Sequence, residues 1–218
     1  MGLIDPGLWF SGGDAGGFAG RPALFLDRDG VIVEDSGYVG DPNGVRLIPG
    51  AAETIAEANR LAVPVVVVTN QSGVARGLFG WDSFEAVQDV IRARLAEAGA
   101  RFDAVLACGY HEKGAGAMAI ADHPWRKPNP GMLTKAAEAM QIDLARSLIV
   151  GDRVADLEAG QRAGLRAGIL VETGKSGEEQ GDPKSLPADF IWRRVDSLGA
   201  ARGAVVRYLT RPQPQAED

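Results

Sequence analysis

Four short segments of this 218-residue chain combine side chains that can act in acid–base and nucleophilic chemistry. Taken singly, each has an ordinary structural explanation, because Asp, Asn and Gly are common in turns and at helix starts. Whether the four segments form one site therefore depends on their order in the chain and on the secondary structure around them. The segments are Asp27-Arg28-Asp29-Gly30-Val31, Thr69-Asn70-Gln71-Ser72-Gly73, Arg126-Lys127-Pro128 and Gly151-Asp152-Arg153-Val154-Ala155-Asp156.

Three of these segments begin where an apolar, strand-like run ends. Asp27, Thr69 and Asp152 each follow such a run directly. A run that is apolar on both faces is typical of a strand buried in a parallel sheet. Ligands of such sheets bind beyond the carboxyl ends of the strands, so we expect the three residues to meet at one edge of one sheet.

Strand-like and helix-like segments alternate along the chain, which predicts an α/β fold with a mostly parallel sheet. Apolar residues at helical spacing predict helices over residues 51–61, 82–98, 132–140, 155–163 and 196–208. Short apolar runs predict strands over residues 23–26, 63–68, 104–108, 147–150, 166–171 and 188–192. The expected organisation is a single domain over residues 21–210.

Both ends of the chain are expected to be loosely ordered. Residues 1–20 are rich in glycine, which costs much entropy to order and offers little to bury, so a flexible tail is predicted. Trp9 and Phe10 are the exception, since they could pin this tail to the domain. Residues 211–218 are predicted to form a second flexible tail, and residues 174–187 a solvated loop outside the site.

The overall composition of the chain argues against several classes of function. A net charge of −6 argues against a nucleic-acid partner, because phosphate backbones attract basic surfaces. No apolar run is long enough for a membrane span, and the chain does not begin with a signal peptide pattern. A single cysteine excludes an internal disulfide, so a reducing, cytoplasmic setting is expected. The expected partner is a small phosphorylated metabolite, and the protein is expected to be a monomer or small homo-oligomer.

Together, the four segments resemble the four motifs of the haloacid dehalogenase superfamily, over residues 23–171. The resemblance implies a Rossmann-like three-layer sandwich and an Mg²⁺-dependent phosphatase that forms an aspartyl-phosphate. Asp27 would be the nucleophile and Asp29 the general acid and base, while Thr69 and Lys127 would hold and neutralise the phosphoryl group. The implied Mg²⁺ ligands are Asp27, Asp152 and the backbone carbonyl of Asp29.

Within the superfamily, the segments at 25–31, 37–39, 69–77 and 126–132 are most similar to bacterial heptose bisphosphate phosphatases and histidinol-phosphatases. These relatives lack a large cap domain, so the loops 34–49 and 109–125 are expected to cover the site. Arg126 suits a second phosphate, because a guanidinium group binds phosphate with two parallel hydrogen bonds. The resemblance places substrate contacts on Arg28, Asp35, Ser36, Gly37, Tyr38, Asn70, Gln71, Ser72, Arg76, Arg126 and Arg153.

Many members of this group hold a structural zinc ion in the loop before Arg-Lys-Pro. Here that loop offers Cys108, His111 and His123, which is one ligand fewer than the usual four. Zinc is therefore not expected, and Cys108 is read as a small apolar residue at the end of a buried strand.

Several other readings stay open. The nearest alternatives to a heptose bisphosphate substrate are histidinol phosphate and a broader range of sugar phosphates. A protein of another class would keep the fold for phosphate binding without catalysis, but the acids needed for chemistry are present. A mutase would require a helical cap where 34–49 is too short, and a dehalogenase reading conflicts with Asp29.

Overall fold

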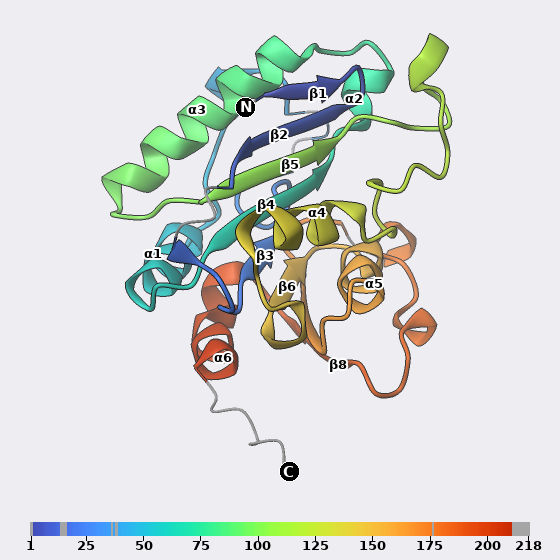
Figure 1. Ribbon diagram of the computed structural model, residues 1–218. Helices are drawn as coiled ribbons and strands as arrows, with labels where there is room; N and C mark the ends of the chain where they lie inside the picture. Colours follow the sequence, from blue (N-terminus) through green and yellow to red (C-terminus); the bar gives the residue numbers. More distant parts are fainter. Residues whose placement is uncertain (1, 14–16, 36, 38, 176, 211–218) are drawn as a thin grey trace.

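One eight-stranded sheet runs through the computed structural model, in the order β1-β2-β5-β4-β3-β6-β7-β8 (Figure 1). The structure describes residues 2–13, 17–35, 37, 39–175 and 177–210. The strands are β1 (Leu3–Asp5), β2 (Leu8–Gly12), β3 (Leu24–Leu26), β4 (Val65–Asn70), β5 (Ala104–Cys108), β6 (Leu148–Gly151), β7 (Ala167–Val171) and β8 (Ile191–Val195).

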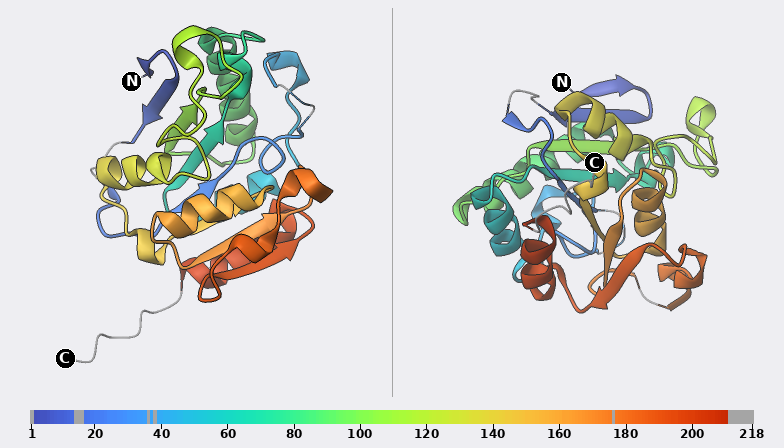
Figure 2. Two further views of the ribbon diagram at one scale, coloured as in Figure 1. Left: turned by 90° about the vertical axis from the view of Figure 1, so that its right-hand side faces the viewer. Right: turned by 60° about the horizontal axis from the view of Figure 1, so that its bottom comes forward.

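Helices cover both faces of this sheet, which gives three layers (Figure 2). One face is covered by α1 (Ala51–Arg60), α3 (Trp81–Glu97) and α6 (Leu198–Leu209), and the other by α4 (Gly131–Met140) and α5 (Val154–Arg162). The α2 helix (Ser72–Ala75) is a single turn after β4. The short 3-10 helices are η2 (Pro42–Gly44), η3 (Gly116–Met118), η4 (Leu144–Arg146), η5 (Gly177–Gln180) and η6 (Pro183–Ser185).

The central strands are apolar on both faces because both faces are covered. Strands β3, β5, β6 and β7 are wholly buried, and β4 is buried as far as Thr69. Strands β3 to β8 pair in parallel, as the alternating pattern predicts. The chain runs outward from β3 through β4 to β5, then crosses back to β6. The boundary between β3 and β6 is therefore a topological switch point, where ligands of such sheets bind.

The predicted helices and strands are confirmed within a few residues of their expected ends. The largest difference is at β8, which begins at Ile191 rather than at residue 188. No large cap domain interrupts the described part of the chain, and none of its helices is long and apolar enough to cross a membrane. The expected C-terminal tail, 211–218, lies outside the described residues.

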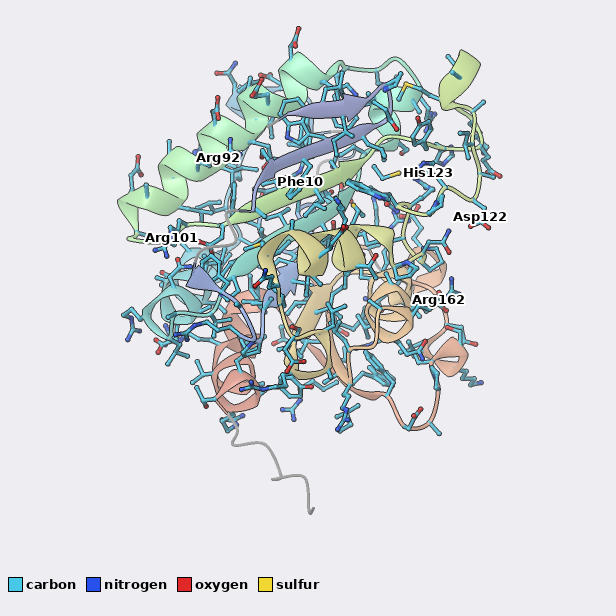
Figure 3. All side chains as sticks on the ribbon, in the orientation of Figure 1. Phe10, Arg92, Arg101, Asp122, His123 and Arg162 are labelled. Atoms are coloured by element: carbon cyan, nitrogen blue, oxygen red, sulfur yellow. The ribbon has the colours of Figure 1, made fainter. Side chains whose placement is uncertain are left out.

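The N-terminal segment differs from the flexible tail predicted for residues 1–20. Strands β1 and β2 form a hairpin, and β2 pairs antiparallel with β5 over its whole length. The cause is the apolar content before the glycines: alternate residues of β2 enter the two cores, with Trp9 on one face of the sheet and Phe10, which is labelled in Figure 3, on the other. Gly12 ends the strand at a φ of +80°, where a Cβ would lie 2.2 Å from the carbonyl oxygen of Asp103.

Replacement of Trp9 by Ala tests whether this hairpin is part of the stable domain. Trp9 is buried, and its ring stacks on Trp81 at 5.9 Å and meets Phe84 edge-on at 5.8 Å. We expect a loss of about 3 kcal/mol or more in the free energy of unfolding, measured by urea denaturation. Ile4→Ala, at a residue that is 51% exposed on β1, is the control and should change it by less than about 0.5 kcal/mol. Equal stability of the two variants would mean that the hairpin contributes little.

Candidate active site

The switch point brings together two of the predicted acids. Asp27 follows β3 and Asp152 follows Gly151 of β6, and the Asp27 N–H donates to the carbonyl oxygen of Val150 at 3.0 Å. Gly30 then turns the chain away with a φ of +79°. A Cβ at this position would lie 2.9 Å from Oδ2 of Asp152, so only glycine allows the backbone to pass so close to this carboxylate.

Lys127 lies at the centre of the site and is almost fully buried. Its Nζ contacts Oδ1 of Asp27 at 2.9 Å and Oδ1 of Asp156 at 2.6 Å, and it donates to the carbonyl oxygen of Val68 at 2.7 Å. Two carboxylates and one carbonyl oxygen therefore surround the ammonium group. Burial alone would lower the pKa of Lys127, but the carboxylates of Asp156 and Asp27 raise it, so the side chain stays charged.

Three carboxylates share this position with a single lysine. Oxygen atoms of Asp27, Asp152 and Asp156 lie within 4.8 Å of one another. Burial raises the pKa of Asp152 to about 8, and the charges of Asp27 and Asp156 add to the shift. Burial also raises the pKa of Asp27, against the opposing effect of Lys127. Close, buried carboxylates with this excess of negative charge fit a hard cation that takes oxygen ligands.

Asn70 fixes the position of Lys127 from the neighbouring strand. Its side chain exchanges two hydrogen bonds with the Lys127 backbone: Nδ2 donates to the carbonyl oxygen at 3.0 Å, and Oδ1 accepts from the N–H at 3.1 Å. Thr69 is buried beside it, and its Oγ1 accepts from Nε2 of Gln71 at 2.9 Å. The second and third predicted segments are thus joined by side-chain hydrogen bonds.

A cavity of about 370 Å³ opens over these residues. Basic side chains line it beside the acidic cluster, so the cavity can hold a phosphorylated ligand near Asp27. Among the residues predicted from the sequence, it is lined by Asp27, Asp29, Asp35, Gly37, Asn70, Gln71, Ser72, Arg126, Lys127, Asp152 and Arg153. Ser36 and Tyr38 lie outside the described residues.

Three predicted site residues do not line this cavity. Thr69 lies below its surface, and Arg76 is exposed beyond α2. Arg28 is the clearest departure, because its side chain is only 1% exposed and turns away from the cavity toward the Phe84 ring. The substrate contact predicted for Arg28 is therefore replaced by contacts within the protein, the first of them with Asp29.

Two residues of the site, Asp156 and Lys175, were not assigned a role from the sequence. Asp156, on the first turn of α5, joins the acidic cluster, and its spacing of four residues from Asp152 was the available signal. Lys175 lies in the stretch that was predicted to be a loop outside the site, but it lines the cavity together with Glu179. The backbone N–H of Lys175 donates to Oδ2 of Asp152 at 2.8 Å, and its Nζ contacts Oδ2 of Asp35 at 2.9 Å.

The Lys175–Asp35 pair joins two segments that are far apart in the sequence. Figure 2 (left) shows the blue segment that follows β3 approaching the orange segment that follows β7. The other Asp35 oxygen, Oδ1, accepts from the Gly37 N–H at 2.8 Å. One side of the cavity is therefore held by an ion pair and a short turn.

The segment between β5 and α4 lies beyond the carboxyl end of β5, where Figure 3 labels Asp122 and His123. The His123 ring stacks on Tyr110 at 4.3 Å, and its Nδ1 accepts from the Trp125 N–H. Nδ1 of His111 accepts from the Lys113 N–H. Cys108, His111 and His123 do not gather into a group of potential metal ligands within the described part of the chain.

The fold and the site define a class. A buried aspartate follows the central strand of a parallel sheet, a lysine contacts it, and further aspartates follow the adjacent strand. This arrangement is that of the hydrolases of the haloacid dehalogenase class, and it supports attack by a carboxylate on a phosphate ester. In agreement, residues 124–201 match the HAD-hydrolase-like family model.

Individual relatives agree with this class. A D-glycero-beta-D-manno-heptose-1,7-bisphosphate 7-phosphatase of Mesorhizobium japonicum is 54% identical over 171 residues, or 78% of this chain and 79% of that protein. The crystal structure of a HAD-like phosphatase from Mesorhizobium loti has a TM-score of 0.84 and 46% identity, over 97% of this chain and 99% of that one. The D,D-heptose 1,7-bisphosphate phosphatase from B. bronchiseptica, complexed with magnesium and phosphate, has a TM-score of 0.73 and 34% identity. That comparison covers 86% of this chain and 99% of the other.

The chain belongs to the haloacid dehalogenase superfamily, in the family of phosphatases that contains these relatives, and it is a phosphatase.

Lys175→Met tests whether the ion pair with Asp35 supports substrate binding. The variant keeps the backbone contact to Asp152 but removes a cation from the cavity and frees the Asp35 carboxylate. A partly buried ion pair contributes about 1 kcal/mol, so we expect kcat/KM to fall about five- to tenfold, mainly through KM. Lys184→Met, at an exposed lysine of η6 that does not line the cavity, is the matched control. Identical kinetics in the two variants would contradict a role for Lys175.

The thiol of Cys108 should be unreactive in the folded protein. The side chain is buried at the end of β5, and burial raises the pKa of the thiol to about 12. Because the thiolate is the reactive form, iodoacetamide should label the native protein negligibly between pH 7 and 9. The urea-unfolded protein is the control and should be labelled with the pH dependence of an ordinary thiol. Since the chain has one cysteine, rapid native labelling near pH 8 would show that this thiol is accessible.

Proposed function

We propose that this phosphatase hydrolyses a heptose bisphosphate, of the D-glycero-D-manno-heptose 1,7-bisphosphate type, by way of a phosphorylated Asp27. The observation that carries the chemistry is the buried Asp27–Lys127–Asp156 arrangement at the floor of a cavity with further cations. The substrate class is supported by the names of relatives at 54% and 34% identity.

Asp27, Asp152 and the backbone carbonyl of Asp29 are the groups that would hold Mg²⁺, and the clustered carboxylates of Asp27, Asp152 and Asp156 supply the negative charge that fits such an ion. When bound, the ion supplies positive charge that lets an anionic carboxylate approach an anionic phosphate ester. The relative from B. bronchiseptica is complexed with magnesium and phosphate. A Mg²⁺ requirement of this chain is part of the proposal.

The first step transfers the phosphoryl group to the protein. A carboxylate oxygen of Asp27 attacks phosphorus while the bond from phosphorus to the sugar oxygen breaks, and Asp29 gives its proton to that oxygen. Lys127 contacts Asp27 and offsets the negative charge that collects on the phosphoryl oxygens. The products of this step are a free sugar hydroxyl and an acyl phosphate on Asp27.

The second step returns the protein to its starting state. The Asp29 carboxylate accepts a proton from water, and the water oxygen attacks phosphorus as the bond to Asp27 breaks. Inorganic phosphate leaves with Asp27 as a carboxylate and Asp29 protonated again. Asp29 lines the same cavity as Asp27, which supports its assignment to both proton transfers.

A bisphosphate needs cations at two places, and the cavity supplies them. Besides Lys127, it is lined by Arg126, Arg153 and Lys175. The Nη1 of Arg126 donates to the carbonyl oxygen of Tyr110 at 3.0 Å, which fixes one end of its guanidinium group. We propose that these three cations bind the phosphate group that is not hydrolysed.

Phosphate release from a substrate panel tests this proposal. With Mg²⁺, we expect the highest kcat/KM for one anomer of the heptose 1,7-bisphosphate, and lower values for histidinol phosphate and common sugar monophosphates. Asp27→Asn should lose at least about 10³-fold in kcat, because it removes the nucleophile. Asp89→Asn, at an exposed aspartate of α3, should match the wild type. EDTA should abolish activity, and added Mg²⁺ should restore it.

Different outcomes of this panel would contradict the proposed substrate, the proposed nucleophile or catalysis itself. A preference for histidinol phosphate, or equal rates for all compounds, would overturn the heptose substrate and keep the mechanism. Retained activity in Asp27→Asn would overturn the nucleophile. No release from any compound by a folded, Mg²⁺-supplied protein would favour a binding protein without catalysis.

A further inference from the structure

Arg28 lies between the two acids of the first segment, yet it does not face the substrate cavity. Its Nε contacts Oδ1 of Asp29 at 2.8 Å, and its Nη2 contacts Oδ2 of the same carboxylate at 2.9 Å. The guanidinium carbon lies 5.3 Å from the centre of the Phe84 ring. Two parallel hydrogen bonds to one carboxylate fix both its position and the plane in which it lies.

Gln71 completes this arrangement from the second segment. Its Oε1 accepts from Nη2 of Arg28 at 3.1 Å, while its Nε2 donates to Oδ2 of Asp29 and to Oγ1 of Thr69, both at 2.9 Å. Nη2 of Arg28 also approaches the carbonyl oxygen of Val39 at 3.4 Å. Arg28 therefore contacts the acid, the end of β4 and the loop that follows β3.

The simpler explanation of these contacts is that Arg28 and Asp29 form a purely structural ion pair. Two arguments favour an additional role of Arg28 in the function of Asp29. A buried ion pair is a weak source of stability, because desolvation of both charges offsets their attraction. Moreover, Arg28 is buried while Asp29 keeps 19% of its side chain exposed and lines the cavity, so the arginine contacts the Asp29 carboxylate from the protein interior.

We propose that Arg28 is a positioning residue that orients the Asp29 carboxyl group toward the leaving oxygen of the substrate. This inference rests on the proposed role of Asp29 as the acid and base. The guanidinium group contacts the Asp29 carboxyl oxygens and not the substrate; it holds the carboxyl group in one plane, with help from Gln71. The contact with Val39 also ties this orientation to the loop that carries Asp35.

The dependence of the rate on the leaving group separates positioning from binding. An alkyl phosphate releases a poor leaving group that needs a proton, whereas 4-nitrophenyl phosphate releases a stable anion that needs little help. Misplacing Asp29 should therefore slow phosphoryl transfer from the alkyl ester far more than from the aryl ester. Direct binding of phosphate by Arg28 would affect both esters alike.

The experiment compares Arg28→Lys with the wild type, each with and without Asp29→Asn. Lysine keeps the charge but cannot form two parallel hydrogen bonds with one carboxylate. We expect Arg28→Lys to lower kcat/KM about 10- to 100-fold for an alkyl phosphate such as the best sugar phosphate of the panel. For 4-nitrophenyl phosphate the expected loss is less than about fivefold, with the inhibition constant of inorganic phosphate unchanged within about twofold. In the Asp29→Asn background the same substitution should cause little further loss, because it acts through Asp29.

Circular dichroism and urea denaturation establish that each variant is folded, and Arg28→Met provides a second substitution of similar length if the lysine variant does not fold. A raised inhibition constant for phosphate with equal losses on both esters would show that Arg28 binds substrate, and would overturn the inference. Full additivity of the two substitutions would also overturn it. If Asp29→Asn alone keeps wild-type kcat/KM on the alkyl ester, the proposed role of Asp29 fails as well. If Asp29→Asn is impaired and Arg28→Lys is not, only the positioning inference fails.

Discussion

The site depends on one buried ammonium group surrounded by carboxylates. Lys127 neutralises part of the negative charge that Asp27 and Asp156 bring into the interior, and the backbone carbonyl of Val68 satisfies its third donor. Lys127 lowers the free-energy cost of bringing three carboxylates within 4.8 Å of one another, although burial still raises the pKa of Asp152 to about 8. Even with Lys127, negative charge remains in excess, which is why the cluster suits a divalent ion. The stability of the folded site and its chemistry thus have the same electrostatic origin.

The topology of the sheet makes this crowding possible. Strands β3 and β6 are adjacent in space, although their paired residues Leu26 and Val150 are 124 positions apart in the sequence. Each strand delivers an aspartate at its carboxyl end, and the α5 helix that follows β6 adds Asp156 from its first turn. Because these strands are buried on both faces, close packing against helices fixes the position of their ends. The cluster is held by rigid elements, while its ligands reach it from the open edge.

Much of this arrangement could be predicted from the sequence, because it follows from local patterns and one topological rule. Apolar runs identified the strands before Asp27, Thr69 and Asp152, and parallel packing placed their ends at one edge. The direction of the Arg28 side chain could not be predicted, since it depends on where Gln71 and Phe84 lie in the folded chain. The N-terminal hairpin was missed for a related reason. The glycine content of residues 1–20 hid an alternating strand whose partner, β5, lies nearly 100 residues later.

The walls of the cavity explain why its specificity is harder to predict than its chemistry. No large cap covers the described domain, so the walls come from short segments that follow the strands β3 to β7. These segments have weak patterns of their own, and their positions depend on contacts such as Lys175 with Asp35 and Arg126 with the Tyr110 carbonyl. A catalytic carboxylate is fixed by the strand that carries it, whereas a wall residue is fixed by a partner from a distant segment. Changes in such partners can therefore alter which phosphate ester is accepted while the acids and Lys127 stay in place.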